Sequence, residues 1–150
     1  MQTTRERIYL AALLHDIGKF YQRADTGSSS ESKLLSEQIK RLETTYCPVR
    51  EGKYTHKHVL WTAQFIEDFK PVFDALVNNQ EDTGNNLLSL ACSHHLKPDQ
   101  LTPLAAIIRL ADHLSSGMDR SSDLSYQDEQ VVSEWDKFRR VRMVSVFEGI

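Results

Sequence analysis

Residues 10–20 read LAALLHDIGKF, and the chemistry of this stretch decides the fold of the chain. Small and apolar residues lead up to His15 and Asp16, which place an imidazole beside a carboxylate. Burying an ionised carboxylate next to such a run costs free energy unless the charge is paired or coordinated. The stretch therefore predicts a polar site on the buried side of an otherwise apolar helix.

Apolar residues recur at steps of three and four along most of the chain, which is the spacing of helices that bury one face. The first helix begins at the Thr3–Glu6 capping box and is expected to run to about Arg23. The other expected helices cover residues 31–43, a stretch from 56–58 to 69, a short piece around 73–77, then 87–95 and 103–116, where Gly117 ends the last. The expected core positions include Phe65, Phe69, Leu104, Ile107, Ile108 and Ala111. Loops are expected at 25–30, 46–55, 82–84 and 118–130, so the pattern predicts an all-α bundle.

Further potential metal ligands occur on other predicted helices. His94 and His95 are adjacent, and Asp112 lies within the apolar run AAIIRLADHL, in line with Ala105 and Ile108. A cation bound by imidazole and carboxylate would offset the cost of burying all these groups, and ligands without thiolate suit zinc, manganese, iron, cobalt or nickel. A single histidine or a single half-buried aspartate is more often structural, so the prediction of a site for one or two metal ions depends on the combination.

Composition excludes several classes of protein. The chain has 150 residues, of which 40% are hydrophobic and 26% charged, as expected for one globular domain. No apolar run approaches the roughly 20 residues that span a bilayer, and no signal-peptide pattern is present, so a cytoplasmic protein without membrane contact is expected. Cys47 and Cys92 are too few and too far apart for a thiolate zinc site, and are predicted to be free, packed thiols.

The net charge of −3 argues against strong nonspecific binding of nucleic acid by the whole chain. The charge is uneven, however, because residues 1–24 carry four basic side chains and two acidic ones. This basic segment could guide a phosphate backbone locally but would not hold a long nucleic acid alone.

The end of the sequence predicts a different structure. Residues 140–150 alternate apolar and polar side chains through Val141, Met143, Ser145 and Phe147, as in a strand. We expect a domain over residues 1–139, and a strand or linker at 140–150 that leads into a following domain.

The string His15-Asp16-Ile17-Gly18-Lys19 resembles the signature doublet of the HD phosphohydrolase superfamily. Most of that superfamily carries a further histidine before the doublet, but residues 1–14 contain none. The candidate is His58 in KHVLWTAQFIED, an order similar to the circularly permuted HD domain in the large subunit of type III CRISPR complexes. GKFYQRA, HVLWTAQFIE, the SHH at 93–95, ADHLSSGMDR and the closing VSVFEGI resemble its subtype A, or Csm, members.

The resemblance implies a set of site residues. The metal ligands would be His15, Asp16, His58, His94, His95 and Asp112. Asp16 would touch both metals, and the His94–His95 pair would serve the second metal or the substrate phosphate. His56 and His113 are weaker candidates, His56 because helical geometry should point it elsewhere. In SSGMDR, Asp119 and Arg120 are expected to tie down the loop.

Two basic residues are candidates for contacting substrate. Lys19, one turn after the doublet, would neutralise a phosphate oxygen and assist catalysis; a solvated lysine or an ion pair with Asp16 is an equal alternative. Arg23 is the second candidate.

The implied activity is metal-dependent hydrolysis of single-stranded DNA. It would occur within a ribonucleoprotein of several subunits that holds guide RNA and target RNA. The family also makes cyclic oligoadenylates from ATP, in Palm domains whose GGDD motif is absent here. The alternatives are an HD enzyme acting on nucleotides or cyclic nucleotides, and a docking module without catalysis.

Overall fold

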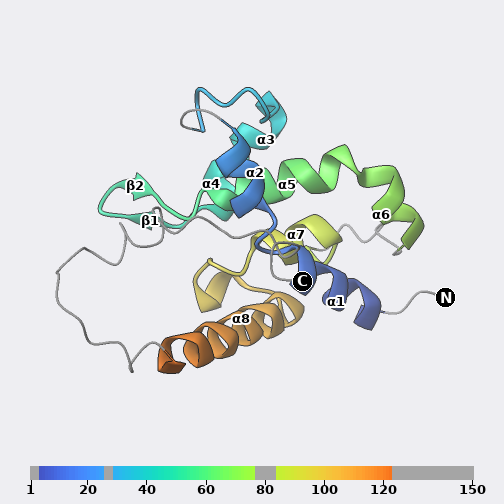
Figure 1. Ribbon diagram of the computed structural model, residues 1–150, viewed down its shortest axis with the longest axis vertical. Helices are drawn as coiled ribbons and strands as arrows, with labels where there is room; N and C mark the ends of the chain where they lie inside the picture. Colours follow the sequence, from blue (N-terminus) through green and yellow to red (C-terminus); the bar gives the residue numbers. More distant parts are fainter. Residues whose placement is uncertain (1–3, 26–28, 77–83, 123–150) are drawn as a thin grey trace, which may run out of the picture. The chain divides into compact units, whose positions relative to one another are not determined.

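The computed structural model describes residues 4–25, 29–76 and 84–122 (Figure 1). The chain divides into two compact units, Met1–Gly117 and Met118–Ile150, and all contacts described below lie within the first. The expected cap at Thr3, the turn at residues 82–83, and the strand at 140–150 fall outside the described residues, as do the side chains of Asp119 and Arg120.

The described residues are mostly helical, which confirms the predicted all-α class. In chain order the elements are α1 (Thr4–Leu14), α2 (Gly18–Ala24), α3 (Glu37–Arg41), α4 (Glu43–Tyr46), β1 (Val49–Arg50), β2 (Lys53–Tyr54), α5 (His58–Asp68), α6 (Lys70–Leu76), α7 (Leu87–Cys92), the 3₁₀ helix η1 (Pro98–Gln100) and α8 (Pro103–Ser122). None of the described helices is both long enough and apolar enough to cross a bilayer.

Helix α5 is the central element, packed against α2 and α7, and α1 also packs against α7 (Figure 1). Every side chain of α5 from His58 to Gln64 is buried. The hydrophobic core forms two clusters, one around Ala11, Leu90 and Ile108, and one around Trp61. Both cysteines are buried and free, as predicted. The core therefore surrounds the helix that begins at His58.

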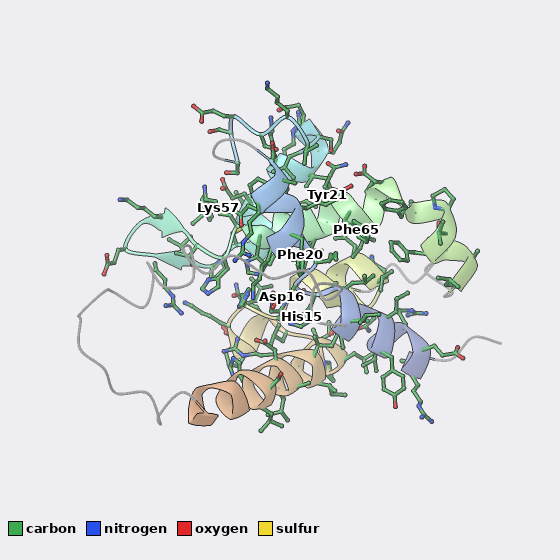
Figure 2. All side chains as sticks on the ribbon, in the orientation of Figure 1. His15, Asp16, Phe20, Tyr21, Lys57 and Phe65 are labelled. Carbon is green, nitrogen blue, oxygen red and sulfur yellow. The ribbon has the colours of Figure 1, made fainter. Side chains whose placement is uncertain are left out.

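The predicted first helix is interrupted. α1 ends at Leu14 and α2 begins at Gly18, so the His-Asp doublet lies in a turn between two helices. The apolar spacing continues through the break because Gly18 and Tyr21 of α2 still face α5; the Tyr21 ring packs edge-on against Phe65, 5.4 Å between centroids (Figure 2). Periodicity alone could not reveal the break.

The predicted helix over residues 31–43 is also wrong at its start. Helical structure begins only at Glu37, because serine side chains bond to the backbone that precedes it. Ser32 Oγ accepts from the N–H groups of Leu34 and Leu35, and Ser36 Oγ accepts from Ile39 N–H as the N-cap. The expected loop at 46–55 contains the hairpin β1–β2, whose turn residues Glu51 and Gly52 both have positive φ, as favoured two-residue hairpin turns require.

Helix α8 begins as predicted and ends later. Thr102 Oγ1 accepts from Ala105 N–H at 3.3 Å, which confirms the cap. The helix continues through Gly117 to Ser122, since an interior glycine costs a helix only about 1 kcal/mol. Two expected core residues are exposed, Ile107 at 52% and Phe69 at 44%, and Ala111 is exposed as well. Ile108 is buried as expected.

Candidate metal centre

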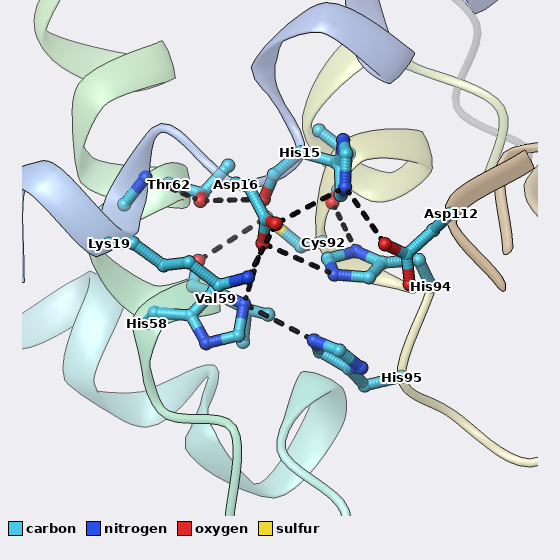
Figure 3. A network of polar contacts seen from close by, with 12 residues as sticks. His15, Asp16, Lys19, His58, Val59, Thr62, Cys92, His94, His95 and Asp112 are labelled. Atoms are coloured by element: carbon cyan, nitrogen blue, oxygen red, sulfur yellow. Dashed lines mark hydrogen bonds and ion pairs between the residues drawn. The ribbon is translucent and has the colours of Figure 1, made fainter. Parts of the chain in front are cut away.

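Six imidazole and carboxylate side chains from four separate stretches of chain meet in one place (Figure 3). They are His15 and Asp16 in the turn after α1, His58 at the start of α5, His94 and His95 in the turn after α7, and Asp112 on α8. His94 and His95 were expected within the helix over residues 87–95. α7 ends at Cys92, so both histidines lie beyond it. The structure thus brings together every residue predicted as a ligand.

The ligand atoms form two groups that share Asp16. Asp16, His58, His94 and His95 make one group, and His15, Asp16 and Asp112 make the other; within each, all the ligand atoms lie within 4.8 Å of one another. Asp16 Oδ1 is 3.2 Å from His58 Nε2, and Oδ2 is 3.5 Å from His15 Nε2. One oxygen of the same carboxylate therefore faces each group.

Asp112, on helix α8, completes the second group. Its Oδ1 lies 3.5 Å from His15 Nε2, and its side chain is 19% exposed. It follows the buried Ala105 and Ile108 on α8, so the predicted stripe does carry a carboxylate into the bundle.

Backbone carbonyls orient two of the rings. His15 Nδ1 lies 2.6 Å from the carbonyl oxygen of Ala12, and His94 Nδ1 lies 2.9 Å from that of Ala91. A carbonyl oxygen only accepts, so each Nδ1 carries a proton, and in the neutral ring the lone pair is on Nε2. Both lone pairs point towards Asp16 (Figure 3).

The centre contains acceptors without donors. His15 Nε2, His94 Nε2 and Asp16 Oδ1 are buried and have no partner with hydrogen-bond geometry among the described residues; His58 Nε2 is close to Oδ1 but does not meet that geometry. Lone pairs and a carboxylate oxygen that face one another repel unless a cation lies between them. Nitrogen and oxygen ligands without thiolate suit a divalent transition metal, so these residues could hold one.

The electrostatics keep the ligands in the forms that bind metal. Burial would raise the pKa of the Asp16 carboxyl, but His58 and Lys19 outweigh it and hold this pKa well below its usual range. Burial, with His15 and His58 nearby, lowers the pKa of His94 to about 4, and burial beside His94 also lowers the pKa of His95. At neutral pH the carboxylate is charged and these two imidazoles are neutral, as metal binding requires.

These shifts predict that the metal-free protein loses stability in mild acid. Between pH 4 and 6.5 the unfolded chain binds a proton at residue 94 that the folded chain does not, so the free energy of unfolding rises with pH across this window. On acidification through this window, the contribution of His94 alone should lower the free energy of unfolding by an amount on the order of 3 kcal/mol. Urea unfolding in EDTA at a series of pH values measures it. His94→Asn should make the profile shallower, with the remaining slope due to His95, and a flat profile in the wild type would contradict the assignment of a neutral, buried His94.

His56 lies closer to the centre than helical geometry suggested. It precedes α5 with a φ of 55°, so the helical projection does not apply to it. Its ring centroid is 4.1 Å from that of His95, and His95 Nε2 lies 3.2 Å from His58 Nε2. The ring of His56 therefore contacts a ligand residue, whereas the helical projection pointed it elsewhere. Neither His56 nor His113 belongs to a ligand group, so both stay weaker candidates.

The two basic candidates are placed differently. Lys19 Nζ lies 2.5 Å from Asp16 Oδ2, which confirms the ion-pair alternative. Arg23 is exposed in the last turn of α2. Contact of either side chain with a substrate stays a prediction.

Two residues near the centre were missed by sequence reasoning. Thr62 on α5 bonds the turn that carries the doublet, and an Arg109 N–H donates to the carbonyl of Leu96, tying the turn of His94 and His95 to α8. A signal existed for the first: Thr62 is a polar residue in the apolar run VLWTAQFI, one helical turn after His58. No local signal existed for Arg109, since its partner is a backbone atom in another segment.

The comparisons with known proteins agree with this geometry. The HD domain model matches residues 1–117, which include all six converging side chains. No curated protein and no solved structure matches the chain. HD domains are generally metal-dependent hydrolases, and the arrangement of histidines and aspartates around Asp16 fits that chemistry. The chain belongs to the HD domain family.

Proposed function

We propose that this chain is a metal-dependent phosphodiesterase that cuts single-stranded DNA, acting as the HD domain of the large subunit in a type III CRISPR complex of subtype A, the Csm type. The observation that carries the hydrolytic part is the position of Asp16 between two groups of ligands. One carboxylate facing two sets of imidazole and carboxylate atoms suits one or two divalent ions, with manganese, nickel, cobalt, iron and zinc as the candidates.

The chain's own residues would bind the cation and orient the ligand atoms around it. When bound, a divalent cation lowers the pKa of a water towards neutrality and stabilises charge on the phosphate. Neutral imidazoles and an ionised Asp16 hold the ligand atoms ready, and the carbonyls of Ala12 and Ala91 keep the Nε2 atoms of His15 and His94 turned inward. Lys19 next to Asp16 would place a positive charge near a phosphate oxygen.

The choice of single-stranded DNA depends on the resemblance and on the charge of α2. The doublet before His58, the SHH at 93–95 and ADHLSSGMDR are similar to the type III large subunit. Lys19 and Arg23 are four residues apart on α2, so their side chains lie on one side of that helix and would contact neighbouring phosphates. The proposed partners are the other subunits with guide and target RNA, and synthesis of cyclic oligoadenylates would belong to Palm domains elsewhere in a longer protein.

A substrate panel tests the proposal. The purified chain, stripped with EDTA and reloaded with Mn²⁺, Ni²⁺ or Co²⁺, should cleave a labelled single-stranded oligodeoxynucleotide and should be inactive in EDTA. It should prefer this substrate to duplex DNA, deoxynucleoside triphosphates and cyclic dinucleotides. A variant with both His15→Ala and Asp16→Ala should be inactive under all conditions, which controls for contaminating nucleases.

Each other outcome has a defined meaning. Preference for mononucleotides or cyclic dinucleotides would replace the nuclease with a nucleotide phosphohydrolase. Metal binding without hydrolysis of any substrate would support the docking module. Unchanged DNA cleavage by the double variant would show that the activity does not depend on His15 and Asp16.

A further inference from the structure

The turn that carries the His-Asp doublet is attached to α5 through one buried hydroxyl. Thr62 is fully buried, and its Oγ1 donates to the carbonyl of His15 at 3.0 Å and accepts from the N–H of Gly18 at 3.1 Å. These two backbone groups lie on either side of Asp16 in the chain. The hydroxyl therefore brackets the residue that both ligand groups share (Figure 3).

Thr62 bonds the two backbone groups that lose their helical partners where the helix is interrupted. In a continuous helix, the carbonyls of Leu14 and His15 would accept from Gly18 and Lys19. Here the carbonyl of Leu14 accepts from the backbone N–H of Ile17 at 3.0 Å. The backbone N–H of Lys19 donates to the backbone carbonyl of Asp16, also at 3.0 Å. The carbonyl of His15 and the N–H of Gly18 are thereby left without helical partners at a buried site. The Thr62 hydroxyl, with one donor and free lone pairs, satisfies both.

Close backbone contact makes this attachment possible. A Cβ on Gly18 would lie 2.1 Å from the carbonyl oxygen of His58 and 2.6 Å from Thr62 Oγ1. Only glycine lets α2 approach α5 at this distance. The turn is thus held against the same helical turn of α5 that begins with His58.

Thr62 and His58 act on Asp16 from the same helix. They are four residues apart, so they share a face of α5. His58 Nε2 approaches the Asp16 carboxylate at 3.2 Å, while Thr62 holds the backbone on both sides of Asp16. Side chain and backbone of Asp16 are therefore placed by one rigid element.

We infer that Thr62 is a positioning residue of the metal centre: its hydroxyl holds the turn so that Asp16 presents one oxygen to each ligand group. The inference rests on the proposed function, in which Asp16 binds metal. Groups behind a ligand typically change metal affinity 10- to 100-fold when removed. Loss of the hydroxyl should therefore weaken metal binding, and not merely the stability of the fold.

Affinity for Mn²⁺ alone, measured by isothermal titration calorimetry, is the test. Thr62→Val keeps the shape of the side chain and removes both bonds, and should weaken Mn²⁺ binding by about 10- to 100-fold. Thr62→Ser keeps the hydroxyl and should bind within about threefold of the wild type. Each titration is run where circular dichroism shows that the metal-free variant is fully folded. Electron paramagnetic resonance of bound Mn²⁺ should show an altered environment in Thr62→Val and the wild-type environment in Thr62→Ser.

The matched control is the neighbouring residue on α5. Trp61 is also buried, and its Nε1 donates to Asp25 at 2.9 Å, away from the doublet. Trp61→Phe removes a buried hydrogen bond from the same helix, and should lower thermal stability while leaving the Mn²⁺ affinity unchanged. If Thr62→Val does not fold, Thr62→Ala, which places no apolar branch against Gly18, takes its place with the same expected loss.

The two proposals fail in different ways. If the wild type binds Mn²⁺ and the hydroxyl-free variant binds it equally well while losing stability like Trp61→Phe, Thr62 is only structural and the inference is overturned. If the wild type itself binds no Mn²⁺, the proposed function fails, and the role of Thr62 fails with it.

Discussion

Replacing Asp16 with asparagine is expected to reduce metal-dependent cleavage by more than about 100-fold, because removing groups behind a ligand already costs 10- to 100-fold. Asp16 is the only side chain common to both ligand groups of the described residues. The amide has the same shape but no charge, and its nitrogen cannot coordinate. The loss should appear in kcat/KM with the proposed substrate, single-stranded DNA, and in the amount of Mn²⁺ bound per chain.

The control for this substitution is Asp74→Asn. Asp74 also pairs with a lysine, Lys70 at 2.7 Å, but on an exposed part of α6. Its loss should leave both metal binding and cleavage unchanged. Normal Mn²⁺ binding by Asp16→Asn would show that the carboxylate is not a ligand.

Gly18→Ala is expected to lower the free energy of unfolding by about 3 kcal/mol, at the upper end of the cost of overpacking. The added methyl would meet the backbone of His58 and Thr62, at 2.1 Å and 2.4 Å, where neither a rotamer change nor a small shift relieves the overlap. On an exposed face of a helix the same substitution would raise the free energy of unfolding by about 1 kcal/mol. The sign of the change therefore shows whether Gly18 lies against α5 or faces solvent. Urea unfolding in EDTA measures it without a contribution from metal.

Gly52→Ala is the comparison for this second substitution. Gly52 has a φ of +74° but nothing within 4 Å of its missing Cβ, so alanine there meets only the backbone preference, about 1–2 kcal/mol. Gly18→Ala should be the more damaging of the two and should also weaken Mn²⁺ binding. A stabilised Gly18→Ala would mean that α2 does not lie against α5 as described.

Much of the fold, and the site residues other than His58, could be predicted from sequence because their signals are local in the chain; His58 was predicted from the resemblance. Helical spacing gave α5 and the start of α8, and Thr102 with Pro103 marks a helix start in any context. Asp16 and Asp112 stood out because a carboxylate on an apolar face needs a compensating partner. Their meeting across the bundle follows from that need.

The features that were missed depend on contacts between distant segments. The break after Leu14 is stabilised by Thr62, which belongs to another helix, so the residues around the doublet do not reveal it. His56 was misplaced because its positive φ removes it from the helical projection that was applied to it. Gly117 was taken as a stop signal, but a glycine ends a helix only where the chain adopts a left-handed conformation there.

The ligands come from four stretches that are far apart in sequence, and this has a consequence for the chain as a whole. An ion held between His15, Asp16 and Asp112 would tie the first helical segment to the last one described, as a disulfide does in proteins that have one. Such a tie gains most when the closed loop is long, because it removes the most freedom from the unfolded chain. Loss of the ion would then lower the stability of the helices from α1 to α8, so that the same ion would support both the fold and the proposed chemistry.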